Sequence, residues 1–321
     1  MASNKIGYRI FFAFLALGLV LALALTMGAV GVLWYYGRDL PDYQQLADYQ
    51  PPITTRVHAA DGRLIAEFAR ERRLFVPISA MPKLVSDAFI SAEDKNFYSH
   101  SGLDVVGVLR AAVQNVANVA QSRRLVGAST ITQQVTKNFL LSNEVTAERK
   151  IKEIVLALRI ERTFSKDRIL ELYLNEIYLG GGAYGVASAA LQYFDKSLAE
   201  LEPAEAAFIA ALPKAPNNYN PIRFAERAKA RRDWVIERMA EDGVLSPEAA
   251  AKAAATPLNV RMREDYQLAR SDWFAEEVRR QLYQRFGENG VYESGLSVRS
   301  SMSSRLQDIG EKALRQGLID Y

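Results

Sequence analysis

The stretch GASTITQQVTKN, residues 127–138, is unusually rich in hydroxyl and amide side chains for the start of a helix. Thr130 and Gln133 have capping-box spacing, in which each side chain accepts a hydrogen bond from the other residue's backbone N–H. A helix that begins here also presents free N–H groups and the positive end of its dipole, with Lys137 one or two turns later. The stretch predicts a helix start that seats an anionic phosphate, and simple capping is a compatible alternative.

A pair of carboxylates precedes that helix, in the stretch EDKNFYSHSG at residues 93–102. An apolar helical stripe comes directly before it, so we expect Glu93 to lie at a helix end that is followed by a loop. Phe97 and Tyr98 reduce the hydration of a nearby carboxylate, which raises its pKa towards the range of a general base. Glu93 is therefore a candidate base. On this stretch alone a solvated cap or a salt bridge is the commoner arrangement, and His100 alone indicates a structural role.

Two cations and a carboxylate open the following helix, in the stretch RKIKE at residues 149–153. Arg149 and Glu153 are four residues apart, a spacing that ordinarily gives a surface salt bridge. With Lys150 close by, the same carboxylate suits a site that holds a pyrophosphate and stabilises its charge as it leaves. Both interpretations stay open at this point.

Helical periodicity dominates from about residue 81 to residue 238 and predicts a mainly α fold. The apolar stripes are Leu84, Val85, Phe89 and Ile90; Val105, Val106, Leu109, Val113 and Val116; and Ile151, Ile154, Val155 and Leu158. Residues 166–175 predict a packing helix with Ile169, Leu170, Leu172 and Tyr173 facing inward. The glycines at 180–182 terminate it, and because no strand precedes them, a P-loop or dinucleotide-binding fold is excluded.

The amino end predicts a transmembrane helix at residues 10–36, which contain no charged residue. About 20 apolar residues cross a bilayer, whereas the apolar part of a signal peptide is only about 7–15 residues long. Lys5 and Arg9 precede the segment, and an aromatic belt, residues 34–36, ends it, so residues 1–9 should stay cytoplasmic. A buried core helix is the alternative, but it needs a protein shell on all sides.

The segments on either side of the helical region predict small β elements. Residues 37–80 are expected to form a stem that links the membrane helix to the main body. Within it, apolar and polar residues alternate over 54–68 on either side of Asp61-Gly62, which predicts a hairpin with a type I′ turn. The main body is expected at 81–243. Residues 244–321 predict a linker and the start of a further domain that is not present, with β-prone sequence at 291–302.

Composition limits the classes of function. The 321 residues are 49% hydrophobic and 24% charged, which is typical of a folded protein, and a net charge of +3 with a pI near 8.9 does not favour nucleic-acid binding. The chain has no cysteine, which excludes disulfides and cysteine-rich zinc sites and fits an oxidising compartment such as the periplasm.

The motifs, taken in order, resemble those of the peptidoglycan glycosyltransferase family. They are Glu93-Asp94 with Phe97, His100 and Gly102, then residues 127–134, then Arg149, Lys150 and Glu153, then residues 166–175, with Arg231-Arg232 and Val235-Ile236 as a fifth motif. The match spans roughly residues 80–240. The flanking segments are similar to the amino-terminal half of class A penicillin-binding proteins. Because Ser-x-x-Lys and Lys-Thr-Gly are absent, their acyl-transfer activity is not assigned to this chain.

The resemblance implies a lysozyme-like fold with a membrane-facing jaw at residues 120–145, where residues 139–141 would touch lipid. It implies that Glu93 is the catalytic base and that Glu153 is the second carboxylate, which orients its neighbouring cations or helps to hold a divalent cation, Mg²⁺ or Mn²⁺. The residues expected to contact substrate are Asp94, His100, Ser129, Thr130, Gln133, Gln134, Lys137, Asn138, Arg149, Lys150 and, with weaker support, Lys214.

The implied reaction polymerises lipid II into β-1,4-linked glycan strands outside the bacterial inner membrane, with release of undecaprenyl pyrophosphate. The implied partners are lipid II, the growing strand, membrane lipid and other cell-wall synthesis proteins. Two alternatives remain. A lysozyme-like enzyme that cleaves glycan has no pyrophosphate to neutralise, so the cations at Lys137, Arg149 and Lys150 argue against it. The carboxylates Glu93 and Glu153 argue against a non-catalytic membrane scaffold.

Overall fold

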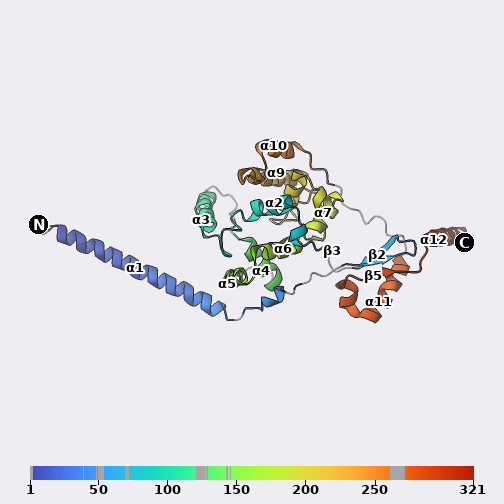
Figure 1. The fold of residues 1–321 in the computed structure, drawn as a ribbon, viewed down its shortest axis with the longest axis horizontal. Coiled ribbons are helices and arrows are strands. Elements are labelled where there is room, and N and C mark those ends of the chain that lie inside the picture. Colours follow the sequence, from blue (N-terminus) through green and yellow to red (C-terminus); the bar gives the residue numbers. More distant parts are fainter. Residues whose placement is uncertain are drawn as a thin grey trace.

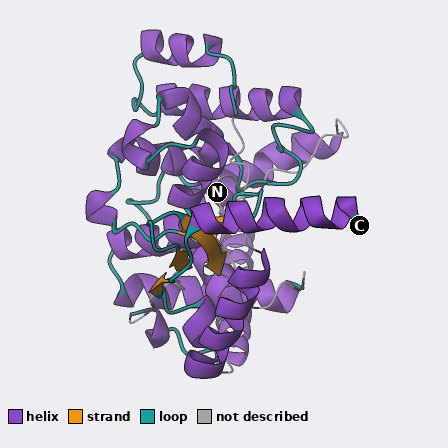
Figure 2. Cartoon of the chain, turned by 90° about the vertical axis from the view of Figure 1, so that its right-hand side faces the viewer, coloured by secondary structure: helices purple, strands orange, loops and turns teal. Residues whose placement is uncertain are grey.

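The computed structural model describes residues 3–38, 40–47, 49, 54–68, 72–120, 127, 129–141, 144, 146–260 and 272–321. Helices predominate in these residues, and the strands are few and short (Figure 2). The mainly α fold predicted from periodicity is confirmed. Pro51 and Pro52 of the predicted stem lie outside the described residues.

Helix α1, Ser3–Tyr36, projects away from the rest of the chain (Figure 1). Its segment Phe12–Tyr36 is the one stretch of the described residues that is long and apolar enough to cross a membrane, and it is not buried inside the protein. At its end the guanidinium of Arg38 lies 3.4 Å from the centre of the Trp34 ring. An exposed apolar helix of this length needs lipid around it, which supports the predicted membrane segment.

A body of helices forms the main core. The helices are α2 (Lys83–Glu93), α3 (Val105–Ala120), α4 (Ile131–Leu140), α5 (Ala147–Thr163), α6 (Lys166–Glu176), α7 (Val186–Phe194), α8 (Pro203–Ala211), α9 (Ala225–Glu241) and α10 (Pro247–Ala255), with 3-10 turns η1 (Gln44–Leu46), η2 (Ile78–Ala80) and η3 (Leu198–Glu200). Helix α8 is apolar on nearly every side, because α2 and α9 both pack against it. It is the centre of the core.

Helix α6 packs as predicted, with Ile169, Leu170, Leu172 and Tyr173 buried. The chain then reverses through the glycine cluster to begin α7. Gly185 has a φ of +77°, and a Cβ there would lie 2.5 Å from the carbonyl oxygen of Asn175. Only glycine fits this close approach, so Gly185 serves the turn into α7.

Helix α3 differs from the other helices of the body. The predicted apolar stripe is present, but it faces outward: its five residues are between 62% and 75% exposed. A continuous apolar face of this kind marks an interaction surface rather than a core.

A second, smaller unit combines segments from both ends of the chain. Strands β1 (Thr55–His58), β2 (Leu64–Phe68) and β5 (Ser297–Arg299) form one sheet in the order β2-β1-β5, with β1 antiparallel to β2 and parallel to β5. Helix α11 (Asp272–Tyr292) covers the sheet and α12 (Ser304–Asp320) follows it (Figure 1). The hairpin is therefore more than a link to the main body, because it shares a core with residues 272–302.

The predicted type I′ turn at Asp61-Gly62 is wrong. A type I′ turn needs positive φ at both central residues, but only Gly62 has it, at +86°. Ala59 donates its N–H to the carbonyl of Arg63 at 2.8 Å and accepts from Gly62 at 3.0 Å. The loop thus has three residues and ends in a left-handed glycine, which is the next commonest hairpin connection.

The stem also contacts the helical body. Strand β3 (Arg72–Arg73) pairs in parallel with β4 (Ala183–Tyr184). The amide of Asn175 donates to the carbonyl of Val76 at 2.9 Å and accepts from its N–H at 2.8 Å. These bonds fix the stem along α6 before the chain enters α2.

Candidate active site

Glu93 is the last residue of α2, which packs against α9, and its side chain is bonded to Gln134 of α4. Burial raises the pKa of this carboxyl. Gln134 opposes that effect by donating from Nε2 to Oε2 of Glu93 at 2.8 Å, and the positive charges of Arg231 and Lys214 oppose it as well. A carboxylate of raised pKa that is hydrogen bonded by a neutral amide is suited to accepting a proton.

Tyr173 holds the other end of the Gln134 amide. Its hydroxyl donates to Oε1 of Gln134 at 3.4 Å, which leaves the amide N–H groups to face Glu93. Tyr173 is buried, and burial together with the charge of Glu93 raises the pKa of its phenol, so it stays a donor. The sequence predicted Tyr173 only as a packing residue.

The loop after Glu93 is fixed to the start of α4. Nε2 of His100 lies 3.0 Å from both oxygens of Asp94, and Nδ1 accepts from the N–H of Gly102 at 3.1 Å. This pattern assigns the proton to Nε2. Asp94 also accepts from the N–H of Ile131 at 3.0 Å. The side chains of Asp94 and His100 thus bond to groups of the protein itself and hold the loop in place. Their contact with substrate stays a prediction.

The predicted capping box is confirmed. The hydroxyl of Thr130 accepts from the N–H of Gln133 and donates to the carbonyl of Gly102 at 2.8 Å, while the Gln133 amide accepts from the N–H of Thr130. Both residues are buried. Capping of α4 therefore accounts for these two side chains, and substrate contact from them stays a prediction too.

A second cluster of charged side chains centres on Glu153, which lies on the buried face of α5. Its carboxylate is ion paired with Lys150 and with Arg149, the latter at 3.5 Å. Lys150 also donates to the hydroxyl of Ser129 at 2.9 Å, which ties this group to the residue just before α4. Nε of Arg149 is buried without a partner among the described residues. The predicted pair of Arg149 and Glu153 is present, and Lys150 of the same group reaches the start of α4.

The remaining predicted contacts lie around the same helix. Lys137, partly buried, and Asn138, exposed, are in the last turns of α4. Within the described residues, Lys137 has no carboxylate within ion-pair distance. Lys214 is exposed in the loop between α8 and α9, and its charge acts on Glu93. The structure thus distributes cations on both sides of α4.

Arg231 of α9 is a site residue that the sequence did not single out. Its charge acts on Glu93, and burial lowers the pKa of its guanidinium. The neighbouring Arg232 is fully buried and donates to the carbonyls of Thr256 and Ala254, at 2.7 and 3.0 Å. The fifth motif named both arginines, but only the register of α9 decides which of them faces the site.

A divalent cation does not fit this set of side chains as a protein-held ion. Among the described residues, no group of three or more His, Asp or Glu side chains lies close enough to bind one. The carboxylate of Glu153 already carries two cationic partners, whereas Mg²⁺ needs free oxygen ligands. The predicted Mg²⁺ or Mn²⁺ stays a prediction, and we assign no step to it.

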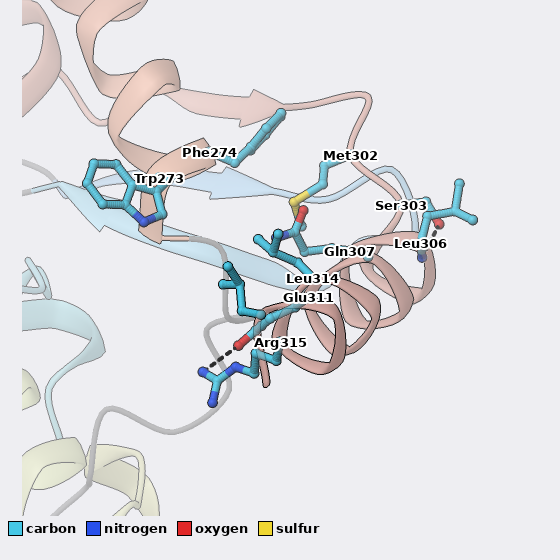
Figure 3. A pocket seen from close by; sticks show the side chains of 11 residues that line it. Trp273, Phe274, Met302, Ser303, Leu306, Gln307, Glu311, Leu314 and Arg315 are labelled. Atoms are coloured by element: carbon cyan, nitrogen blue, oxygen red, sulfur yellow. Dashed lines mark hydrogen bonds and ion pairs between the residues drawn. The ribbon is translucent and has the colours of Figure 1, made fainter. Parts of the chain in front are cut away.

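A groove in the smaller unit has a different character. It lies between α11 and α12 and is lined by Trp273, Phe274, Met302, Ser303, Leu306, Gln307, Gly310, Glu311, Leu314, Arg315 and Leu318 (Figure 3). Its charged lining residues, Glu311 and Arg315, are paired with each other at 2.8 Å. This groove has no titratable group free for chemistry, so the candidate active site is the region around α4.

Comparison with known proteins identifies the family of this chain. Residues 61–240 match the family model described as Transglycosylase. Penicillin-binding protein 1A of Rickettsia bellii is 50% identical over 306 residues, which cover 94% of this chain and 39% of that protein. Penicillin-binding protein 1A of Aquifex aeolicus is 43% identical over 302 residues, which cover 94% of this chain and 40% of that protein.

A solved structure is also similar. The crystal structure of penicillin-binding protein 1A from Haemophilus influenzae has a TM-score of 0.52 and 29% identity, and the match covers 85% of this chain and 30% of that chain. The chain spans about two-fifths of the length of the curated relatives it matches. Since the family model covers more than half of the chain, including α2 to α9, the chain belongs to the transglycosylase family.

Proposed function

We propose that this protein is a peptidoglycan glycosyltransferase that polymerises lipid II into β-1,4-linked glycan strands and releases undecaprenyl pyrophosphate. The family assignment supports glycosyl transfer as the class of activity. The observation that carries the proposal is the carboxylate of Glu93, which is half-buried, hydrogen bonded by Gln134 and flanked by the charges of Arg231 and Lys214.

Glu93 acts as the general base. It takes the proton of the acceptor sugar's 4-hydroxyl as that oxygen attacks the anomeric carbon of the donor. Burial raises the pKa of Glu93, which makes its carboxylate a stronger base than an exposed one, while the Gln134 amide opposes part of that shift and orients the carboxylate. One displacement converts the α-linked pyrophosphate into a β-glycoside, so a single base suffices and no glycosyl-enzyme intermediate is needed.

The group around Glu153 stabilises the leaving pyrophosphate. Glu153 holds Arg149 and Lys150 in place, and these cations offset the negative charge that develops on the leaving oxygen. Ser129, just before α4, accepts a hydrogen bond from Lys150, and Lys137 on α4 adds a further positive charge. Cleavage of a glycan by water expels a neutral sugar hydroxyl, so these cations support transfer from a pyrophosphate donor rather than lysozyme-like hydrolysis.

Two surfaces support a substrate that is delivered by a membrane. Helix α1 has the length and composition of a membrane anchor, and the outward apolar face of α3 adds a second surface that is suited to lipid. We propose that α1 crosses the bacterial inner membrane with residues 1–9 in the cytoplasm and the helical body outside. Phe139 packs edge-on against Tyr49 with ring centres 4.8 Å apart, so lipid contact from residues 139–141 is limited on that side.

The test is polymerisation by the purified protein in detergent with fluorescent lipid II, with products resolved by size. The parent is expected to make long glycan, and Glu93→Gln to lose about 10²–10⁴ of its rate, the usual contribution of a general base. Glu248→Gln, an equal change at an exposed position of α10, is the matched control and should retain the rate.

Each outcome separates one interpretation. Polymer from the parent and from Glu248→Gln, with none from Glu93→Gln, supports the proposal. Shortening of preformed glycan by the parent would instead indicate a cleaving enzyme. A folded parent that binds lipid II without polymerising it, with equal behaviour of both variants, would indicate a scaffold.

A further inference from the structure

Two aromatic side chains flank two basic ones along one face of α9, counting its N-cap residue Phe224. Phe224, Arg227, Arg231 and Trp234 are spaced by three, four and three residues, which places them on the same side of the helix. Phe224 and Trp234 are exposed at 39% and 38%, which is unusual for large aromatic residues on a helix that packs against the core. These four residues are named the α9 stripe.

The arginines of the stripe are stacked on its aromatic rings. The guanidinium of Arg227 lies 5.2 Å from the centre of the Phe224 ring, and that of Arg231 lies 3.9 Å from the centre of the Trp234 ring. Stacking uses the flat face of a guanidinium and leaves its N–H groups free to bind carboxylates. The stripe is therefore a row of preoriented donors.

The other basic residues of α9 are neutralised by acidic neighbours. Lys229 pairs with Asp233 at 2.7 Å, Arg232 with Asp233 at 2.6 Å and Arg238 with Glu241 at 2.5 Å. In the part of the chain that the structure describes, Arg227 and Arg231 have no carboxylate within ion-pair distance, and Nε of Arg231 is buried without a partner.

The stripe is continuous with the candidate active site. The charge of Arg231 acts on Glu93, and Lys214 adds a second positive charge beside the same carboxylate. From Arg231 the stripe runs towards the amino end of α9, through Arg227 to Phe224. An anionic ligand that reaches Glu93 would thus find its next contacts along α9.

We propose that the α9 stripe binds the peptide-bearing glycan substrate, with its rings stacked on sugar faces and with Arg227 and Arg231 bound to carboxylates of the stem peptide. This rests on the proposed function, since it extends the same site. Sugar rings present apolar C–H faces that pack on aromatic side chains, and stem peptides carry free carboxylates, so the ligand matches both components of the stripe. Such a ligand reaches the site as incoming lipid II or as the growing strand.

The test compares Arg227→Gln with Lys229→Gln in the full chain. Both changes remove one positive charge from exposed or partly exposed positions of α9, but Lys229 lies off the stripe and pairs with Asp233. The first measurement is binding of soluble, lipid-free glycan that carries intact stem peptides, and of the same glycan after the peptides are removed. Arg227→Gln should weaken binding of the peptide-bearing glycan about tenfold and leave the peptide-free glycan unchanged, and Lys229→Gln should change neither.

Kinetics then distinguish the two sources of the ligand. A higher KM for lipid II with unchanged product length identifies the incoming substrate, whereas shorter products at unchanged KM identify the growing strand. Equal binding by both variants and the parent, with unchanged KM and product length, would overturn the inference while leaving polymerisation intact. A parent that binds peptide-bearing glycan through Arg227 but makes no polymer would contradict only the proposed function.

Discussion

The two glutamates beside α4 sit in opposite electrostatic settings. Glu93, at the end of α2, is contacted by the neutral amide of Gln134, and the cations near it act from beyond ion-pair distance. Glu153, on α5, is in direct contact with Lys150 and Arg149. The first arrangement leaves a carboxylate that can take up a proton, whereas the second holds a carboxylate as the fixed partner of two cations. Two identical side chains are thus suited to two different tasks.

The largest combined effect on rate and stability should come from neutralising Glu153. Glu153→Gln leaves Arg149 and Lys150 without their buried anion, so both cations lose their orientation, and the rate of polymerisation should fall about 10²–10³-fold. The same variant should lose about 1–3 kcal/mol of unfolding free energy, because it breaks a buried charged contact. Initial rates and urea unfolding measure the two effects.

Glu93→Gln supplies the contrast in stability. Burial raises the pKa of Glu93 above its value in the unfolded chain, so above that pKa the folded protein holds an ionised carboxylate at a cost that a glutamine does not carry. This variant should therefore unfold at the same urea concentration as the parent or at a higher one. If Glu93→Gln lost as much unfolding free energy as Glu153→Gln, the proposed difference between the two glutamates would be wrong.

A smaller effect is expected from one of the two cations. Lys150→Met removes the charge that bridges Glu153 and Ser129 and should lower kcat about 10–100-fold, since Arg149 remains. Lys252→Met, at an exposed position of α10, is the matched control. An unchanged kcat in Lys150→Met would mean that the leaving group is stabilised elsewhere.

The loop that follows Glu93 should respond in stability more than in chemistry. Asp94→Ala removes the acceptor for the N–H of Ile131 and for His100, and should cost about 1–3 kcal/mol of unfolding free energy. Activity at low temperature should persist at a reduced level, because Gln134 still orients Glu93. A complete loss of activity in a folded Asp94→Ala variant would give Asp94 a direct part in the reaction.

Local features of the fold were predictable from the sequence. The capping box of Thr130 and Gln133 and the pair of Arg149 and Glu153 depend only on residues three or four apart on one helix, so spacing alone predicts them. The membrane helix follows from length and the absence of charge. Each of these features is decided within a single element.

Features that depend on distant segments were not predictable. The approach of Arg231 to Glu93 depends on how α9 packs against α2, and the parallel pairing of β1 with β5 joins opposite ends of the chain. On α5 the buried face carries Glu153, Leu156, Ala157 and Ile160, whereas the predicted stripe is only partly buried. Hydrophobic periodicity missed this face because an ion-paired carboxylate takes an inward position.

The pH dependence of kcat/KM tests most directly that Glu93 is the base. Because the base must be ionised, kcat/KM should fall as the pH drops through the pKa of Glu93, with a midpoint above the usual range of a glutamate. Gln134→Met removes the hydrogen bond that lowers this pKa, so its midpoint should move to higher pH. A midpoint that stays in place or moves to lower pH in Gln134→Met would contradict the account.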